Sequence, residues 1–447
     1  MTKLKENLKE FSKYPSAVAG TIIIVLLIIA AIIVVIQIPY STAVAKWRGG
    51  EEVWGRNPRT VPPTWFNWFR ADKLIESMEL GLEDEGVEVT EVVTEGGTRI
   101  STIIFPLNFT YTTFPQDIVF YFTSKYESRP PHVSIRAVTP DGREIKVGSF
   151  GVLNSYTYPI SQDSKLKKNL GNISPQIGLF IEKGDETQTA IQGDYQFVVE
   201  VINFEENSSL DVDFVLQGQV FGWAGTDHMR RDIGLPLLWG IPVALVFGLL
   251  AAVGTSVLTM IFAAIGTWYG GWVDGLIQRL TEINMVLPFL PILIMVGTFY
   301  SRNLMTILGV TIALSIFTGG IKSYRAMFMQ IKESTYVEAA RAYGASDGRI
   351  ISKYLIPRII PLLLPTLISS VPAYVFLEAS LALLGIGDPV VPTWGKVIND
   401  AYENAALYRG QYYWILEPAV LLMITGLAFA MLGFALDRLF NPRLRGM

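Results

Sequence analysis

Long runs without a single charged residue constrain this chain more than any other feature. No charge occurs between Asp232 and Asp274, and none occurs in the run from Gly20 to Ile38. An α-helix needs about 20 mainly apolar residues to cross the hydrocarbon core of a bilayer. The sequence therefore predicts an α-helical membrane protein in which these runs are spanning helices.

Charged residues separate further apolar runs, and together the runs predict six spans. The composition agrees, because 17% of the residues are charged and the mean hydropathy is +0.37, whereas soluble domains contain roughly 25% charged residues. The first run is long and lacks a small-residue cleavage site, so we expect a retained anchor. The predicted spans are Gly20–Ile38, Pro236–Ile265, the run between Glu282 and Arg302, the run between Arg302 and Lys322, the run from Arg358 to Gly385, and the run between Glu417 and Asp437.

The composition also excludes several classes of site. Cysteine is absent, which excludes disulfides and cysteine-ligated zinc, and the chain has only 2 histidines, too few for a multi-histidine metal site. The sequence contains no P-loop motif of the Gly-x-x-x-x-Gly-Lys-Ser/Thr type, so we expect no nucleotide cofactor on this chain. The formal net charge of −4 gives no general attraction to nucleic acid.

The distribution of lysine and arginine predicts the orientation, because cytoplasmic loops carry an excess of these residues. They concentrate before the first span, between the fourth and fifth spans, and after the sixth. The opposite short loops hold only Arg302, Lys396 and Arg409. We therefore expect a multi-pass protein of the cell membrane with both termini in the cytoplasm, residues 322–358 as a cytoplasmic loop, and residues 40–232 outside.

The segment 40–232 differs from the rest of the chain in its pattern. Acidic residues outnumber basic ones, and apolar and polar positions alternate in stretches such as HVSIRAV (132–138) and LDVDFVLQGQVF (210–221). Period-two alternation, interrupted by turn sequences such as PDG (140–142), is typical of antiparallel strands. We predict an extracytoplasmic β-rich, sandwich-like domain inserted between the first and second spans. The acidic stretch 81–97 is expected to be a linker or an exposed edge.

The predicted domains are thus 1–39 with the first span, the insertion 40–232, and 233–447 with the other five spans. Three Asn-x-Ser/Thr sequons lie in the insertion, at Asn108, Asn172 and Asn207. Such asparagines are acceptors for N-glycans, although these tripeptides also occur by chance. No pair of carboxylates and no nucleophile with a base stands out there, which favours a structural or docking role over catalysis.

The loop between the fourth and fifth spans is polar, yet its composition favours helix. Residues 322–343 contain neither proline nor glycine, which predicts a helix that continues from the fourth span. Gly344 is expected to end that helix, and residues 347–355 to form a second one. Pro357 would then lie in the first turn of the fifth span. Such a helix–bend–helix unit either rests on lipid headgroups or contacts another protein.

The residues of this loop resemble the EAA motif of the permease subunits of ABC importers. The run EAARAYGASDGRII is similar to the C-type subunits of the dipeptide/oligopeptide permease family. Three further stretches resemble the same family in the same order: GTDHMRRD (225–232), EASLALLGIGDPVVPTWGKVINDA (378–401) and ALDRLFNPRLR (435–445). The residues that match the motif are Glu338, Ala339, Ala340, Gly344, Ile356 and Pro357.

Three features depart from the family pattern. Arg230 stands where the family usually has glycine, and Asn441 replaces the usual aspartate before Pro442. Most relatives also lack an insertion as large as 40–232. These departures weaken the inference of the solute rather than that of the family.

The resemblance implies a fold, a set of partners and a mechanism. The fold is six transmembrane helices of the ABC importer permease type. The partners are a second permease subunit, two ATP-binding cassette ATPases that bind ATP and magnesium, and an extracytoplasmic solute-binding protein. The permease itself would have no catalytic site. Glu338, Ala339, Ala340 and Arg341 would contact the ATPase, and Gly344 would form the turn that presents their helix. The solute would be a dipeptide or oligopeptide, with an oligosaccharide or another small solute as the alternative.

Glu378 is a carboxylate inside the apolar run 359–385. Ionisable groups in membrane segments are costly, which makes Glu378 a candidate for the translocation pathway, with a structural role near the outer end of the span as the alternative. Trp394 and Trp414 lie in or beside the outer segment 388–413, where aromatic residues are expected to anchor helices at the headgroups.

Two other classes of function stay open on the sequence alone. A membrane receptor would use residues 40–232 as its ligand domain and would need no ATPase partner. A membrane enzyme would need a catalytic constellation, and none is evident in the sequence. Copurification with two ATPases and a second permease would distinguish the importer from the receptor.

Overall fold

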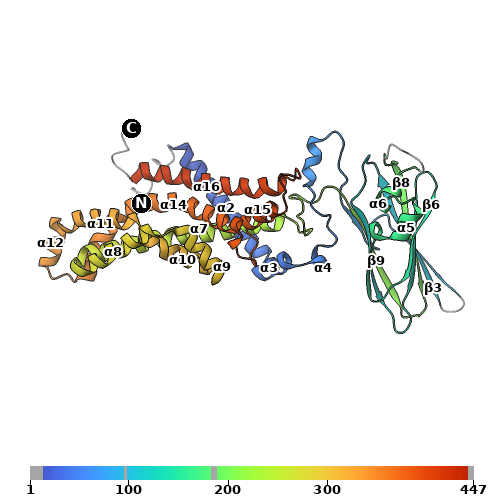
Figure 1. Cartoon of the computed structure of the whole chain (residues 1–447), viewed down its shortest axis with the longest axis horizontal. Coiled ribbons are helices and arrows are strands. Elements are labelled where there is room, and N and C mark those ends of the chain that lie inside the picture. The colour runs from blue at the N-terminus through green and yellow to red at the C-terminus, as the bar shows by residue number, and fades with distance from the viewer. Residues whose placement is uncertain (1–13, 95–97, 183–188, 441–447) are drawn as a thin grey trace. The chain divides into compact units, whose positions relative to one another are not determined.

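The computed structural model describes residues 14–94, 98–182 and 189–440. Two compact units make up the chain (Figure 1): a helical unit, formed by the residues up to 48 and from 235 onward, and a β-rich unit, Gly49–Gly234. The basic residues before residue 14 and the final part of the stretch 435–445, with Asn441, lie outside the described residues.

The helical unit contains the predicted apolar membrane helices. Within the described residues, four helices are long and apolar enough to cross a membrane, and two bent pairs would raise the number to six. The helices are α2 (Pro15–Gln37), α3 (Tyr40–Arg48), α7 (Gly234–Tyr269), α8 (Gly271–Val286), α9 (Phe289–Phe299), α10 (Leu304–Ile316), α11 (Gly319–Lys332), α12 (Thr335–Ala342), α13 (Asp347–Ile350), α14 (Ile356–Leu381), α15 (Trp394–Glu403) and α16 (Tyr413–Phe440).

Small side chains let the long helices pack closely. A Cβ atom built on Gly20 of α2 would lie 2.7 Å from the carbonyl oxygen of Ala428 in α16, so these helices touch through backbone. Gly433 of α16 faces Ser369 of α14 in the same way. Close backbone approach of this kind is common between membrane helices, where van der Waals packing contributes much of the association.

Two bends interrupt the predicted third and fourth spans. Helices α8 and α9 meet at an angle of 81°, and α10 and α11 at 49°. The expectation of a helix continuous from the fourth span to Tyr343 is therefore wrong. Thr318 is extended and precedes Gly319 and Gly320, a sequence with poor helix propensity. A second break lies at Ser334, which is also extended and precedes α12.

In the fifth span the structure has one continuous helix where the sequence predicted two separate ones. Residues 347–355 join the span without a break, because α13, a π-helical turn (Ile351–Leu355) and α14 follow each other directly. The helical run reaches Ile386. Pro357 lies in the first turn of α14. Proline disrupts the helical hydrogen-bond ladder, and a π-type turn is a common local adjustment. Gly385, at a φ of +78°, kinks the end of this run.

The two tryptophans expected to anchor helices at headgroups are instead buried. Trp394 begins α15 and donates its indole N–H to the carbonyl of Leu237 in α7 at 2.8 Å. Trp414 is also fully buried, whereas the neighbouring Tyr408 and Tyr412 are exposed. The tryptophans therefore serve as core residues at this end of the helical unit.

The β-rich unit confirms the prediction of strands between the first and second apolar helices. One antiparallel sheet has the order β1-β9-β4-β7 and the other the order β2-β3-β8-β5-β6. The strands are β1 (Met78–Leu80), β2 (Glu88–Val93), β3 (Arg99–Phe109), β4 (Asp117–Lys125), β5 (His132–Val138), β6 (Glu144–Gly151), β7 (Ser155–Pro159), β8 (Gly193–Asn203) and β9 (Ser209–Gln217). Short helical segments join them: α4 (Glu51–Trp54), η1 (Thr64–Phe69), η2 (Ile160–Gln162), α5 (Ser164–Asn169) and α6 (Pro175–Gly178).

Aromatic side chains from both sheets form one core. Phe105 of β3 stacks on Phe214 of β9 with ring centroids 5.7 Å apart, and Phe120 of β4 lies 6.1 Å from Phe197 of β8. Inward-facing residues of the two sheets thus meet as in a β-sandwich. The acidic stretch near residue 90 forms β2, an edge strand whose six residues are all exposed, in agreement with the expected edge.

The stretch GTDHMRRD (225–232) forms a tight buried turn at the end of this unit. Asp227 accepts hydrogen bonds from the backbone of Met229 and Arg231 and pairs with the Arg231 guanidinium at 2.6 Å. Arg230 has a φ of +65°, a conformation that suits glycine best. Its side chain donates to the Asn57 carbonyl and to Gln217, contacts that glycine cannot make. The departure from the family glycine is thus compatible with the same turn.

We expect Phe120→Ala to lower the free energy of unfolding of the β-rich unit by about 3–5 kcal/mol, because it removes a fully buried ring from the shared core. Thermal unfolding of the full chain, followed by near-UV circular dichroism, measures this change. The control is Val92→Ala on the exposed edge strand β2, which should change stability by less than about 0.5 kcal/mol. Equal midpoints for the two variants would contradict the assignment of the core.

Candidate functional site

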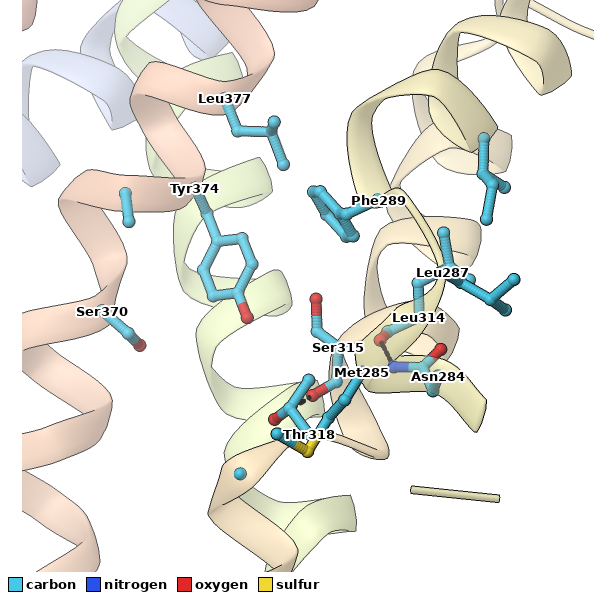
Figure 2. A pocket seen from close by; sticks show the side chains of 13 residues that line it. Asn284, Met285, Leu287, Phe289, Leu314, Ser315, Thr318, Ser370, Tyr374 and Leu377 are labelled. Carbon is cyan, nitrogen blue, oxygen red and sulfur yellow. Dashed lines mark hydrogen bonds between the residues drawn. The ribbon is translucent and has the colours of Figure 1, made fainter. Parts of the chain in front are cut away.

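A cavity of about 580 Å³ lies where the two helix bends face α14 (Figure 2). One wall comes from the bend between α8 and α9, a second from the bend between α10 and α11, and the third from one face of α14. Non-helical backbone at membrane depth is tolerated only where protein or a water-filled cavity satisfies it. The residues that line the cavity are Asn284, Met285, Leu287, Phe289, Ile292, Leu314, Ser315, Thr318, Gly319, Ser370, Ala373, Tyr374 and Leu377.

Asn284 ties the two bends together. Its amide nitrogen donates to the carbonyl of Leu314 at 2.7 Å and to the carbonyl of Phe317 at 2.8 Å. The hydroxyl of Thr259 in α7 donates to a third carbonyl of the same bend, that of Ile316, at 3.0 Å. These carbonyls have no intrahelical partner because α10 ends here. Side chains of α8 and α7 therefore satisfy the backbone that the bend leaves free.

The interior of the cavity combines apolar walls with neutral polar groups. Figure 2 shows the ring of Tyr374 projecting from α14 with its hydroxyl turned toward the side where Ser315 and Thr318 lie. Phe289 and Leu377 face each other across the upper part of the same view. None of the described residues that line the cavity carries a charge. This surface can exchange hydrogen bonds with a polar solute without favouring either sign of charge.

The residues that line this cavity were not predicted from the sequence. Asn284 lies at the start of the predicted third span, and Ser315, Ser370 and Tyr374 are ordinary polar residues within apolar runs. A signal was nevertheless present, because Pro288 interrupts one apolar run and Gly319–Gly320 follows another. Interrupted apolar segments of this kind often indicate a binding site in a transport protein.

Glu378 is not among the residues that line this cavity. It is buried in α14 beside Asp388, near a small hollow that Arg302 also lines. The Thr393 side chain lies beside the Glu378 carboxylate, and its hydroxyl accepts from the backbone N–H of Lys396 at 3.2 Å. Asp388 accepts from the backbone N–H of Leu304 at 2.9 Å. The two carboxylates thus join the end of α14 to the beginnings of α15 and α10.

The EAA residues lie on α12, which ends in a Schellman motif. The backbone N–H of Ala345 donates to the carbonyl of Ala340 at 3.0 Å, and that of Gly344 donates to the carbonyl of Arg341 at 2.9 Å. Gly344 adopts a φ of +77°, which only glycine enters without a steric penalty. The expected break at Gly344 is therefore present, and the pattern of hydrogen bonds explains why glycine suits it.

Helix α12 presents two different faces. Val337 and Ala340 are buried, whereas Glu338, Ala339 and Arg341 are exposed, and Tyr343 is 93% exposed. The small side chain of Ala339 leaves the outer face open to close approach. Pro357 lies farther along, in the first turn of α14. The structure thus groups Glu338 to Gly344 on one short helix and the turn that ends it, and places Pro357 apart from them.

Three polar contacts hold α11 and α12 to helices α7 and α8. Arg325 of α11 forms a two-pronged ion pair with Asp274 of α8, with nitrogen–oxygen distances of 2.8 and 2.6 Å. The Lys332 ammonium donates to the carbonyls of Thr267 and Trp268 at the end of α7. The Arg341 guanidinium lies 4.3 Å from the centre of the Trp268 ring, a cation–π contact. Figure 1 shows α8, α11 and α12 together at one end of the helical unit.

The three sequon asparagines are exposed in the β-rich unit. Asn108 lies on β3, where its amide donates to Asp194 of β8 at 2.7 Å. Asn172 lies in the loop after α5 with a φ of +66°, and Asn207 lies in the turn between β8 and β9.

Known proteins resemble the part of the chain that carries the cavity and α12. Residues 244–446 match the family described as "Binding-protein-dependent transport system inner membrane component". The dipeptide transport system permease protein DppC of Bacillus subtilis is 30% identical over 224 residues, which cover 50% of this chain and 69% of that protein. The oligopeptide transport system permease protein OppC of Bacillus subtilis is 30% identical over 227 residues, covering 50% and 72%. The glutathione transport system permease protein GsiD of Escherichia coli is 29% identical over 234 residues, covering 50% and 73%.

The matched residues include both helix bends, the cavity-lining face of α14 and the Schellman motif that ends at Gly344. These are the elements that a membrane subunit of a transporter needs: a solute-sized space between helices and an exposed helix on which another subunit can act. The chain belongs to the family of binding-protein-dependent transport system inner membrane components, the membrane permeases of ABC importers.

Proposed function

We propose that this chain is one of two membrane permeases in an ATP-driven importer of dipeptides and oligopeptides. The observation that supports this most directly is the neutral cavity at the two helix bends, in a chain similar to dipeptide and oligopeptide permeases. Its volume of about 580 Å³ falls in the range of about 300–1,000 Å³ that is typical of small-molecule sites. The comparisons favour neither an oligosaccharide importer nor a receptor.

A peptide importer needs a passage that accepts side chains of either charge. Hydroxyl and amide groups provide this, because they donate to and accept from the peptide backbone, which is common to all substrates. A charged wall would bind solutes of the opposite sign and repel those of the same sign. In this proposal an extracytoplasmic solute-binding protein delivers the peptide, and the cavity lets it pass.

The proposed topology counts each bent pair as one span, which gives six. The excess of lysine and arginine around α11 to α13 supports a cytoplasmic position for this end of the helical unit. Both termini would then be cytoplasmic. The β-rich unit would be the extracytoplasmic insertion between the first and second spans, and the exposed Asn108, Asn172 and Asn207 would be open to glycosylation.

Coupling to ATP would occur through α12. Its exposed face, with Glu338, Ala339 and Arg341, would enter a groove of a cytoplasmic ATPase, where ATP and magnesium bind. The contacts of Arg325 and Lys332 support this role, because they tie the segment to α7 and α8. A displacement of α12 would therefore be passed to helices that surround the cavity, as in rigid-body switching. This chain would take no part in the hydrolysis itself.

Glu378 would fix the outer end of this passage rather than line its middle. The support is its burial beside Asp388 and Thr393, whose hydroxyl oxygen caps α15. A conformational change that opens the outer end would have to rearrange this junction. Glu378 would thus affect transport through the position of α15 and α10.

Gly344→Asp should abolish uptake and copurification of the ATPases while membrane insertion persists. No atom lies within 4 Å of a Cβ built at Gly344, so the damage would come mainly from a carboxylate on the docking face, at the negative end of the α12 dipole. Gly344→Asn is the matched control, because asparagine tolerates positive φ and carries no charge. Uptake by the aspartate variant at the normal rate would contradict the docking role.

Asn284→Leu should reduce uptake and destabilise the chain by about 1–3 kcal/mol for each carbonyl left without a donor. The substitution keeps the approximate volume but removes both hydrogen bonds to the α10 bend. Met285→Leu is the control, because Met285 lines the same cavity and changes little in volume. Detergent-solubilised thermal stability and vesicle uptake measure the two effects. Identical results for the two variants would show that the tie between the bends is dispensable.

Glu378→Gln should leave the Km for peptide unchanged, because glutamine has nearly the same shape and the residue does not line the cavity. Glu378→Leu should lower the maximal rate severalfold, because it removes the buried polar group beside Thr393 and Asp388. Initial rates of uptake over a range of peptide concentrations separate the two effects. A raised Km for the glutamine variant would instead place Glu378 on the path of the solute.

A further inference from the structure

The sheet edges of the β-rich unit differ in how well they are protected against pairing with a further strand. Within the described residues, the edge strands are β1 and β7 in one sheet and β2 and β6 in the other. Strand β1 has only 3 residues, and β7 ends at Pro159. Strand β6 pairs irregularly with β5, with a register shift between Ile135 and Arg136. Short length, proline and bulges all hinder the addition of another strand, so these three edges are protected.

Strand β2 has none of these features. It pairs with β3 in regular register from Glu88 to Val93. All six of its residues are exposed, including Val89 at 51%, Val92 at 59% and Val93 at 64%. In the part of the chain that the structure describes, no backbone hydrogen bond joins the other edge of β2 to any segment. This edge therefore offers a row of unpaired N–H and C=O groups, with apolar side chains on both faces of the strand.

The turn before β2 holds the strand in place. Leu82 and Val87 pack against the aromatic core of the unit. The Asp84 carboxylate accepts from the backbone N–H of Gly81 at 2.6 Å, and the Asp84 carbonyl accepts from the backbone N–H of Val87 at 3.2 Å. The strand is thus already extended and anchored, so a partner does not have to order it on binding.

The charge around β2 decides what can pair with it. Five exposed carboxylates lie in the strand or just before it: Glu83, Asp84, Glu85, Glu88 and Glu91. No lysine or arginine occurs between Lys73 and Arg99. Arg99 is already engaged, because its guanidinium donates to the carbonyls of Glu206 and Ser208 and lies 3.5 Å from the Glu91 carboxylate. A second copy of β2 would bring like charges together, whereas a basic strand would be attracted.

We propose that the free edge of β2 is the docking site for an extended, basic segment of a partner protein. The segment adds a sixth strand to the five-stranded sheet, antiparallel to β2 like the other pairs of this sheet. Its basic side chains lie opposite Glu88 on one face and Glu91 on the other, because neighbouring residues of a strand point to opposite faces. Its apolar side chains cover Val92 on the first face and Val89 with Val93 on the second. Backbone pairing supplies affinity, and the carboxylates select the partner.

Hydrogen exchange of the full chain in nanodiscs, with one copy in each disc, tests this proposal. The probe is a capped peptide of sequence VVKTVK, which places lysine opposite Glu88 and Glu91 when it pairs antiparallel. It should slow the exchange of the outward-facing amides of 88–93 severalfold and leave β6, at the other edge of the same sheet, unchanged. The acidic peptide VVETVE is the matched control and should give no protection. Equal effects of the two peptides would overturn the proposal.

Two versions of the basic peptide, methylated on alternate backbone nitrogens, test for strand pairing itself. One version directs its methyl groups toward β2 and should give no protection. The other version directs them away from β2 and should protect 88–93 as the parent peptide does. Equal protection by both versions would show that no strand is added, which would also overturn the proposal.

A Glu88→Lys/Glu91→Lys variant should reverse the preference, so that the acidic peptide protects 88–93 and the basic peptide does not. Both residues are exposed, and unchanged exchange in β3 and β8 would show that the variant is folded. A variant that still prefers the basic peptide would contradict the role of the carboxylates. Protection of β2 without any peptide, in vesicles that hold many copies of the chain, would assign this edge to a second copy and refute the proposal.

Discussion

Hydrogen bonds to the free backbone carbonyls at the bend between α10 and α11 hold together the helices that surround the cavity. A bend inside an apolar layer exposes peptide groups that water cannot reach, and each unpaired group is costly. Asn284 and Thr259 satisfy the carbonyls at the end of α10, and Lys332 satisfies those at the end of α7. Both bends line the cavity, so the space for a solute depends on these hydrogen bonds, and one of their donors, Asn284, also lines that space.

The bends also explain how a distant contact can reach the cavity. Helix α11 begins at Gly319, which lines the cavity, and ends at Lys332, just before α12. Its 14 residues extend about 21 Å at 1.5 Å per residue. The ion pair between Arg325 and Asp274 joins the middle of this helix to α8 and so connects the two bent pairs. In the proposed mechanism, a displacement of α12 would reach Thr318 and Asn284 through these contacts.

The sequence predicted features set by local composition and missed those set by tertiary contacts. Charge-free runs indicated the apolar helices, period-two alternation indicated the strands, and Gly344 indicated the end of α12, because each rests on near neighbours in the chain. The bend at Thr318 begins at a local glycine pair but is completed by side chains that arrive from other helices, such as Asn284 and Thr259. Trp394 was misjudged for the same reason, since its buried partner, the Leu237 carbonyl, is distant in sequence. The cavity is the product of such contacts, and its residues were therefore not recognised.

The neutral lining of the cavity has a consequence for which subunit of the proposed importer selects the solute. A wall without fixed charge distinguishes little between acidic, basic and apolar peptides. In the proposed importer, the permease would therefore limit the size of the solute and leave its chemical identity to the protein that delivers it. Such a system could diversify by exchange of the delivery protein, with little change in the membrane helices.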